Sequence, residues 1–141
     1  MADNQTAIAG GLGRAPELRY TTGGRAVASF GVAVERRWQK DGEWTGETSW
    51  FDVTCWGDLA EHAAETLDKG MRVVVIGRLQ QRRYETKEGE TRNVVEIIAD
   101  DIGPSLKWAS AQVTKHTREK YDVRGAEPET YTPPAEDDPF P

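Results

Sequence analysis

Cysteine is scarce in this chain of 141 residues, since Cys55 is its only one. A single thiol excludes a disulfide framework within the chain and any zinc site built on several cysteines. The two histidines, His62 and His116, lie far apart and show no metal-ligand spacing. No nucleophile, base and carboxylate pattern accompanies them, so the sequence predicts no enzyme and no bound cofactor or metal.

Long apolar runs are also missing, and no segment has the apolar centre of a signal peptide. We therefore expect a cytoplasmic protein. A chain of this length is expected to form one domain, large enough to bury a core without covalent cross-links.

The net charge of −6 argues at first sight against a nucleic-acid ligand. The last twenty residues, however, hold six acidic residues and one arginine, while the rest of the chain is nearly balanced. The end of the chain is also rich in proline and poor in aliphatic residues, which is typical of disorder. We predict a folded domain over residues 1–113 and a disordered acidic tail over residues 114–141.

The most informative segment, residues 48–56, alternates as a strand does, so successive side chains are expected on opposite faces. One face carries Phe51, Val53 and Cys55 and is typical of a core. The other face places two tryptophans among polar residues, which favours a surface that stacks flat ligands such as nucleic-acid bases over a buried position. This second face consists of Trp50, Asp52, Thr54 and Trp56.

The other periodic segments surround this strand. Residues 40–47 are predicted to form an exposed hairpin loop, in which Trp44 either caps the hairpin or adds to the stacking face. Residues 58–69 change to a helical period, with Asp58 and Glu61 resembling a capping box and Gly70 ending the helix. Further strands are predicted at residues 6–12, 17–21, 25–37, 71–86 and 91–102.

One short helix inserted among curved strands predicts an all-β fold, a five-stranded Greek-key barrel of the oligonucleotide-binding type (OB-fold). On the long strand at residues 71–86, the even positions are basic in their outer half and end in an aromatic residue, Tyr84.

Six segments, which together span almost all of residues 5–112, carry a resemblance to a known family. They are GLGRAPELRY at residues 11–20, GRAVASF at 24–30, DGEW at 41–44, LAE at 59–61, GRL at 77–79 and IGPSLKWA at 102–109. In these segments the sequence resembles the bacterial single-stranded DNA-binding proteins, in their actinobacterial branch or in phages of such hosts.

The resemblance implies a homotetramer that binds single-stranded DNA without sequence preference, in the nucleoid, during replication, recombination and repair. By position in the family's motifs it implies four stacking aromatics, of which the strand pattern had already indicated two. They are Trp38, Trp50, Trp56 and Tyr84.

Arginines beside these aromatics are candidates for contact with phosphates, although they can equally be solvated strand residues. Neighbouring arginines such as Arg36 and Arg37 point opposite ways along a strand, so not all of them face one ligand. The candidates are Arg36, Arg37, Arg72, Arg78, Arg82 and Arg83.

The acidic end resembles the partner-binding tip of the family, which ends in several acids followed by Pro-Phe. Here Pro141 follows the phenylalanine, which departs from that pattern. We expect the tip to recruit replication and repair proteins, with a purely solubilising role as the alternative. The tip residues are Asp137, Asp138, Pro139 and Phe140.

Two other functions compete with DNA binding. An OB-fold accessory protein of primosomes or recombination, acting mainly as a protein-interaction module, is expected to lack the stacking face. An enzyme of phosphate chemistry requires clustered carboxylates, whereas Asp100 and Asp101 are adjacent on a strand and face apart. Trp108 is expected to pack within the terminal segment of the domain or in a subunit contact.

Overall fold

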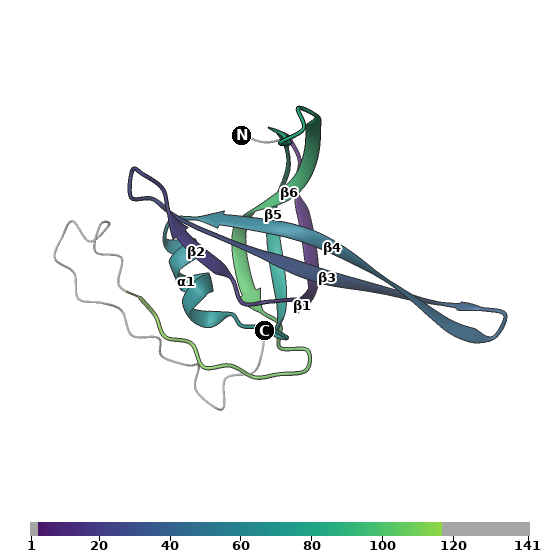
Figure 1. Cartoon of the computed structure of the whole chain (residues 1–141). Helices are drawn as coiled ribbons and strands as arrows, with labels where there is room; N and C mark the ends of the chain where they lie inside the picture. Colours follow the sequence, from purple (N-terminus) through teal and green to yellow (C-terminus); the bar gives the residue numbers. More distant parts are fainter. Residues whose placement is uncertain (1–2, 117–141) are drawn as a thin grey trace. The chain divides into compact units, whose positions relative to one another are not determined.

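A computed structural model describes residues 3–116 of the chain (Figure 1). The chain divides into two compact units, residues 1–109 and residues 110–141. All the helices and strands of the described residues belong to the first unit. The predicted domain boundary at residue 113 stays a prediction, and the predicted disordered tail lies, apart from residues 114–116, outside the described residues.

The first unit consists of six strands and one helix, in the positions that the periodicity predicted with small changes at their ends. In chain order they are β1 (Thr6–Leu12), β2 (Glu17–Tyr20), β3 (Ala26–Lys40), β4 (Glu43–Trp56), α1 (Asp58–Thr66), β5 (Arg72–Glu85) and β6 (Thr91–Pro104).

Five of the strands form a closed barrel. The hydrogen-bonded order is β1-β5-β6-β4-β3, and pairing of β1 with β3, as at Leu12 and Val32, closes the ring. The short strand β2 pairs with β3 alone, outside the ring. Neighbours are antiparallel except β4 and β6, which run parallel. The predicted five-stranded OB-fold barrel with one short helix is confirmed.

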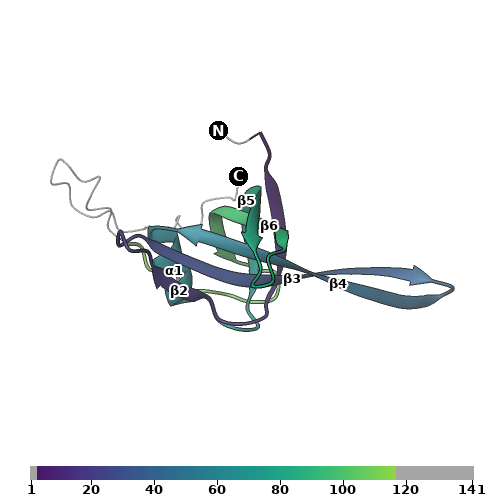
Figure 2. The same ribbon diagram turned by 45° about the horizontal axis from the view of Figure 1, so that its top comes forward.

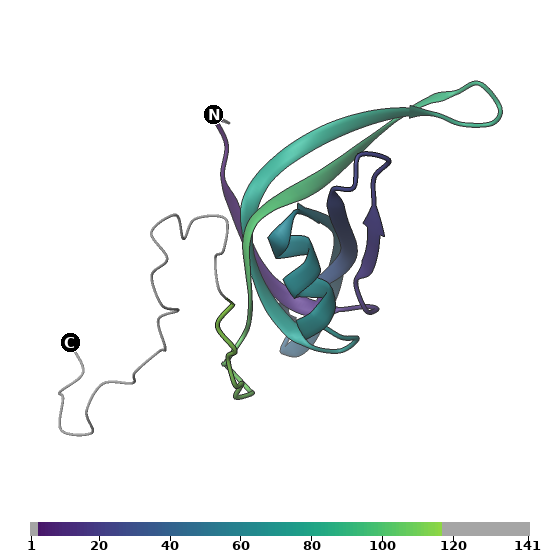
Figure 3. The same cartoon turned by 90° about the vertical axis from the view of Figure 1, so that its left-hand side faces the viewer.

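The core lies inside the barrel and follows the predicted alternation. On β3 the even positions from Ala26 to Val32 are buried, with Phe30 the largest of them. Val53 and Cys55 of β4 are buried beside them. The helix α1 packs on this core through buried Ala60 and Ala63. Figure 3 shows the helix beside the strands.

A close approach of two strands explains Gly10 in β1. A Cβ built on Gly10 would overlap the carbonyl oxygen of Ala33 on β3. Only glycine therefore lets β1 cross β3 closely enough to close the ring. The run of glycines at residues 10–13 marks a curved strand end.

The hairpin between β3 and β4 corrects the sequence prediction. The predicted loop at residues 40–47 is wrong, because the two strands stay paired as far as Lys40 and Glu43. Asp41 and Gly42 alone make the turn, with φ of 53° and 80°. Positive φ at both central residues is the two-residue turn that Asp-Gly sequences favour in hairpins. The result is a long two-stranded ribbon that projects beyond the barrel (Figure 2), and Trp44 lies in β4.

Both ends of α1 also differ from the prediction. The capping box is wrong, because Gly57 is the N-cap residue and no side chain caps the helix. Asp58 is already the first helical residue, which places its carboxylate beyond the cap position. The helix ends at Thr66, before the predicted Lys69. Leu67 takes an extended conformation there and its side chain is buried in the core.

Within the described part of the chain, no helix is long and apolar enough to cross a membrane.

Candidate nucleic-acid interface

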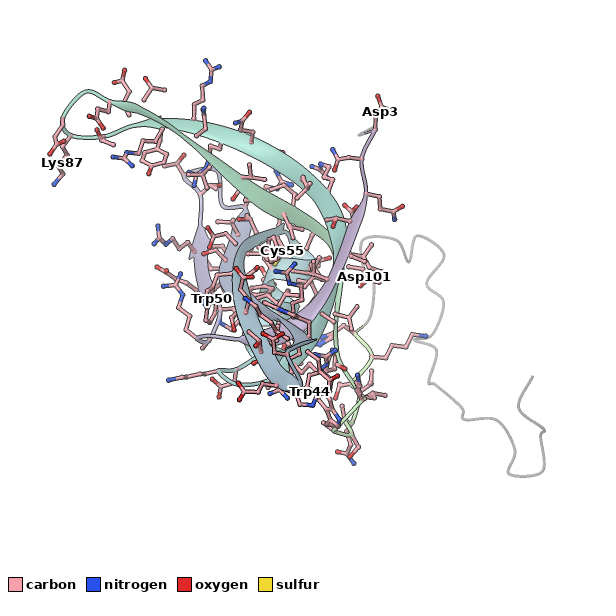
Figure 4. The ribbon with its side chains drawn as sticks, turned by 90° about the vertical axis from the view of Figure 1, so that its right-hand side faces the viewer. Asp3, Trp44, Trp50, Cys55, Lys87 and Asp101 are labelled. Atoms are coloured by element: carbon pink, nitrogen blue, oxygen red, sulfur yellow. The ribbon has the colours of Figure 1, made fainter. Side chains whose placement is uncertain are left out.

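The outward face of β4 carries the aromatics that the alternation predicted. Trp50 is 62% exposed, whereas Val53 and Cys55, on the opposite face, are fully buried. Figure 4 shows Trp50 on the outside of the barrel and Cys55 within it. The burial predicted for Phe51 is wrong: pairing of β4 with β6 begins at Val53, so the partner strand does not cover Phe51.

Strand register joins this face to the basic face of β5. Ile98 of β6 lies opposite Thr54 of β4 on one side and opposite Arg78 of β5 on the other. Residues opposite each other in a sheet point to the same side. Arg82 and Tyr84 follow Arg78 at even intervals along the strand and share its side of β5. We call this continuous surface, from Trp50 and Trp56 on β4 to Arg78, Arg82 and Tyr84 on β5, the candidate interface.

A buried carboxylate lies in the middle of the candidate interface. Glu96 accepts a hydrogen bond of 2.9 Å from the hydroxyl of Thr54. Its other oxygen lies 3.9 Å from Nε of Arg82. Sequence reasoning missed Glu96, because only the pairing of β6 with both β4 and β5 places it here.

The two ends of the candidate interface differ in their surroundings. Trp56 is half-buried at the end of β4, and the guanidinium of Arg25 lies 4.5 Å from its ring centroid. Such a cation–π contact holds the ring and adds a positive charge beside it. Tyr84 is exposed near the tip of the β5–β6 hairpin. No sequence signal pointed to Arg25, which lies just before β3.

Trp38 lies on the other side of the β3–β4 ribbon by strand parity. Trp50 is opposite Ala33 of β3, and Trp38 follows Ala33 on that strand by an odd number of positions, so Trp38 and Trp50 point to opposite sides. Arg36 covers the Trp38 ring at 4.8 Å and forms an ion pair of 2.7 Å with Glu47. The strong twist of two-stranded ribbons determines how far this side turns toward a strand of DNA.

Trp44 has the parity of Trp50 and Trp56 on β4. It is 70% exposed, near the outer end of the ribbon. Sequence reasoning left its role open between a hairpin cap and the stacking face, and placed it in a loop. The two-residue turn instead makes it an exposed strand residue.

The remaining arginines are spread over several surfaces. Arg37 shares the side of Trp50, and Arg83 points away from Arg82 by parity. Arg78 forms an ion pair of 3.4 Å with Asp100. Arg72 lies at the opposite end of β5 from Tyr84 and takes part in a separate cluster.

That cluster surrounds Trp108, which is 74% exposed. The guanidinium of Arg72 lies 4.9 Å from its ring centroid, and Nζ of Lys107 lies 4.8 Å from it. Nε of Arg72 also donates a hydrogen bond of 3.2 Å to the hydroxyl of Ser105. Trp108 therefore lies outside the candidate interface, and its expected subunit contact stays a prediction.

Comparison with known families matches residues 3–105 to the single-strand binding protein family. The chain belongs to this family. It is 47% identical over 119 residues to the single-stranded DNA-binding protein of Mycolicibacterium smegmatis, a match that covers 82% of this chain and 72% of that protein.

Other members of the family are similarly related. The protein of the same description from Mycobacterium leprae is 47% identical over 119 residues, covering 82% of this chain and 71% of that protein. The one from Corynebacterium glutamicum is 45% identical over 121 residues, covering 84% of this chain and 54% of that protein. These relatives agree with the actinobacterial resemblance seen in the sequence.

The family's description names binding and no reaction, in agreement with the prediction that the chain is not an enzyme. The only thiol is inert: Cys55 is buried, and its Sγ lies 3.8 Å from the carbonyl oxygen of Ala28. Burial raises the pKa of this thiol to about 11, so the thiolate nucleophile does not form near neutral pH. Across residues 3–116, no group of three or more potential metal ligands comes together.

Proposed function

We propose that this chain binds single-stranded DNA without sequence preference. The observation that carries the proposal is the exposed Trp50 on a surface that continues to Arg78 and Arg82. Flat aromatic rings stack on bases of any sequence, and guanidinium groups beside them neutralise phosphates. The names of the chain's relatives support the same ligand.

In the proposed complex, a single strand crosses the candidate interface and bases stack on Trp50, Trp56 and Tyr84. Each stacked base contributes about 1–3 kcal/mol. Trp38 adds a fourth stacking position if the ribbon turns its side toward the strand. Duplex DNA is rejected because its bases already stack on one another and do not reach the rings.

The proposed phosphate contacts are the six arginines named from the sequence. Arg78 and Arg82 have the strongest support, because both lie on the candidate interface. Their carboxylate partners, Asp100 and Glu96, hold the guanidinium groups in place before DNA arrives. Phosphates then compete with these carboxylates, which makes the affinity sensitive to salt.

The cellular role that we propose follows from the ligand. Single strands of the genome arise during replication, recombination and repair, and a protein that covers them protects them from nucleases and pairing. Because bacterial genomic DNA lies in the cytoplasm, we place the protein there, associated with the nucleoid.

We also propose a homotetramer, as the resemblance implies. Its support is an apolar surface on the outside of the barrel, where Val74 and Ile76 of β5 are each 38% exposed. They lie opposite Ala9 and Ala7 of β1. Light scattering of the full chain should give the mass of four subunits, and Ile76→Asp should reduce it. A wild-type protein that stays monomeric contradicts this proposal.

We propose that the acidic tail spans residues 114–141. We further propose that it recruits replication and repair proteins. The tip residues Asp137, Asp138, Pro139 and Phe140 lie outside the described residues, so the support is their sequence alone. Deleting residues 136–141 should abolish capture of these partners and leave affinity for DNA unchanged or slightly higher. Capture that survives the deletion shows that the tip only aids solubility.

Tryptophan fluorescence tests the main proposal. Titration of the full chain with poly(dT) should quench the emission, because bases stack on exposed rings. A duplex of the same length serves as the control and should bind far more weakly. No quenching, or equal affinity for the duplex, overturns the proposal and favours a protein-interaction module on the same barrel.

A further inference from the structure

The indole of Trp50 lies against the backbone of two glycines. A Cβ built on Gly13 would lie 2.6 Å from Cζ3 and 2.8 Å from Cη2 of the indole. A Cβ built on Gly31 would lie 3.6 Å from its Cε3, an ordinary contact distance. The space beneath the ring at Gly13 is therefore too small for any side chain.

Strand register explains how the two glycines come together. Gly11 lies opposite Ala33 and Leu12 opposite Val32, so the next pair along the two strands is Gly13 with Gly31. The N–H of Gly13 donates a hydrogen bond of 3.2 Å to the carbonyl of Gly31.

Trp50 reaches this pair from the third strand in the row. On β4 it is opposite Ala33, which makes Gly31 its diagonal neighbour. The indole thus runs diagonally from β4 past Gly31 to Gly13.

We propose that Gly13 is a positioning residue for DNA binding. Because it has no side chain, the Trp50 indole rests on the backbone and turns its outer face to the ligand. That outer face is open, since the residue is 62% exposed. This inference rests on the proposed binding of single-stranded DNA and adds the means by which its principal ring is held.

Glycine is required at position 13 because the Trp50 indole leaves no space for a side chain, and not because the backbone conformation there is unusual. Neither Gly13 nor Gly11 has a φ in the left-handed region, so alanine fits the backbone at both positions. They differ in surroundings: a Cβ on Gly11 has no neighbour within 4 Å. Gly11→Ala is therefore a matched control, two residues away on the same strand segment.

Gly13→Ala displaces the far end of a flexible side chain, so the fold tolerates it while the ring moves. We expect the affinity for a short oligo(dT) to fall at least about fivefold, the lower end of the loss from removing a stacking ring. The melting temperature should stay close to that of the wild type. Gly11→Ala and Gly31→Ala should bind like the wild type.

Introducing Gly13→Ala into the Trp50→Phe variant as well as into the wild type separates the positioning role of Gly13 from a general structural role. Phenylalanine lacks the outer ring atoms that approach Gly13, so Trp50→Phe makes room for a methyl group there. Gly13→Ala should then weaken binding in the wild type and have no effect in the Trp50→Phe variant. The emission spectrum of the free protein should likewise change with Gly13→Ala only when Trp50 is present.

The outcomes are distinct. Wild-type affinity in a folded Gly13→Ala variant overturns the inference, as does an equal loss in the Trp50→Phe background. Unchanged affinity in Trp50→Ala overturns it as well, because no stacking at that ring then needs support. Binding of DNA by the wild type is measured separately, so each of these results leaves the proposed function standing. Only failure of the wild type to bind removes both.

Discussion

The tryptophans of this chain differ in what supports their rings. Trp50 rests on glycine backbone, Trp56 has Arg25 over its ring, and Trp108 has both Arg72 and Lys107 near its ring. Only the first two belong to the surface that continues to the arginines of β5. Exposure alone does not distinguish the candidate interface from the rest of the surface, because Trp108 is more exposed than Trp50.

The contrast predicts different results from two alanine substitutions. Trp56→Ala should weaken binding of a short oligo(dT) by about 1–3 kcal/mol, since one stacked base loses its ring. Trp108→Ala removes an equally large side chain outside the candidate interface and should leave this affinity unchanged. Fluorescence anisotropy with a labelled oligonucleotide measures both. A loss of similar size in both variants contradicts the assignment.

Ionisation of Cys55 makes the free energy of unfolding of the barrel depend on pH. Its pKa is raised from 9.0 to about 11 by burial, so above pH 9 the thiol ionises in the unfolded chain and stays protonated in the folded one. The free energy of unfolding should therefore fall as the pH rises from about 9 to about 11, by an amount on the order of 3 kcal/mol at most. Below pH 9 the Cys55 thiol is protonated in both the folded and the unfolded chain, so its ionisation takes nothing from the free energy of unfolding.

Urea unfolding at several pH values measures this effect, with Cys55→Ala as the control. All other side chains are the same in both proteins, so the difference between the two curves reports the thiol. If the two proteins lose stability in parallel above pH 9, the thiol ionises equally in both states.

At the scale of elements, the β3–β4 ribbon depends on its two-residue turn. Asp41 and Gly42 both have positive φ, and at Gly42 a β-branched residue is strongly disfavoured. Among residues 3–116, no third strand pairs with the ribbon beyond the barrel. Isolated hairpins are marginally stable, so the turn decides whether the outer residues stay paired.

Gly42→Val should therefore loosen the outer ribbon without unfolding the barrel. Amide hydrogen exchange near Arg37 and Trp44 should quicken by about tenfold or more, which corresponds to about 1.4 kcal/mol of local stability. Gly46→Ala is the control, because a Cβ there meets only ordinary contacts at 3.7 Å. Exchange that quickens in the core strands as well indicates global destabilisation.

For the whole molecule, the excess of negative charge and the proposed ligand are compatible because the charge is unevenly placed. Most of the acidic excess lies in the last twenty residues, while arginines line the candidate interface. Binding of a polyanion depends on the local potential around the site. Release of counterions from the DNA should then make the affinity fall steeply with salt.

Substitution of two adjacent arginines tests whether the salt dependence of DNA binding arises at the candidate interface. Arg82 faces the candidate interface and Arg83 faces away, so Arg82→Ala should reduce the slope of log affinity against log salt by about 0.7, one phosphate contact on a single strand. Arg83→Ala removes the same charge from the other face and should leave the slope unchanged. Equal slopes in the two variants mean that only net charge matters.

Much of the barrel follows from residues adjacent in sequence. The alternation on β3 and β4 correctly predicted which side of each strand is buried, because side-chain direction along a strand depends only on position parity. It was wrong for Phe51, whose burial depends on where β6 begins to cover β4. The Asp-Gly turn was readable too, but the polar residues around it suggested a loop.

Local sequence thus determined the strands, their inner faces and the uneven charge. Tertiary structure alone decided which outer faces became one surface. Parallel pairing of β4 with β6 joined Trp50 to Arg82 and placed Glu96 between them, and closure of the barrel brought Gly13 beneath the indole. These relations join strands that are distant in sequence, so their register is set by ring closure and core packing and leaves no periodic signal in the chain.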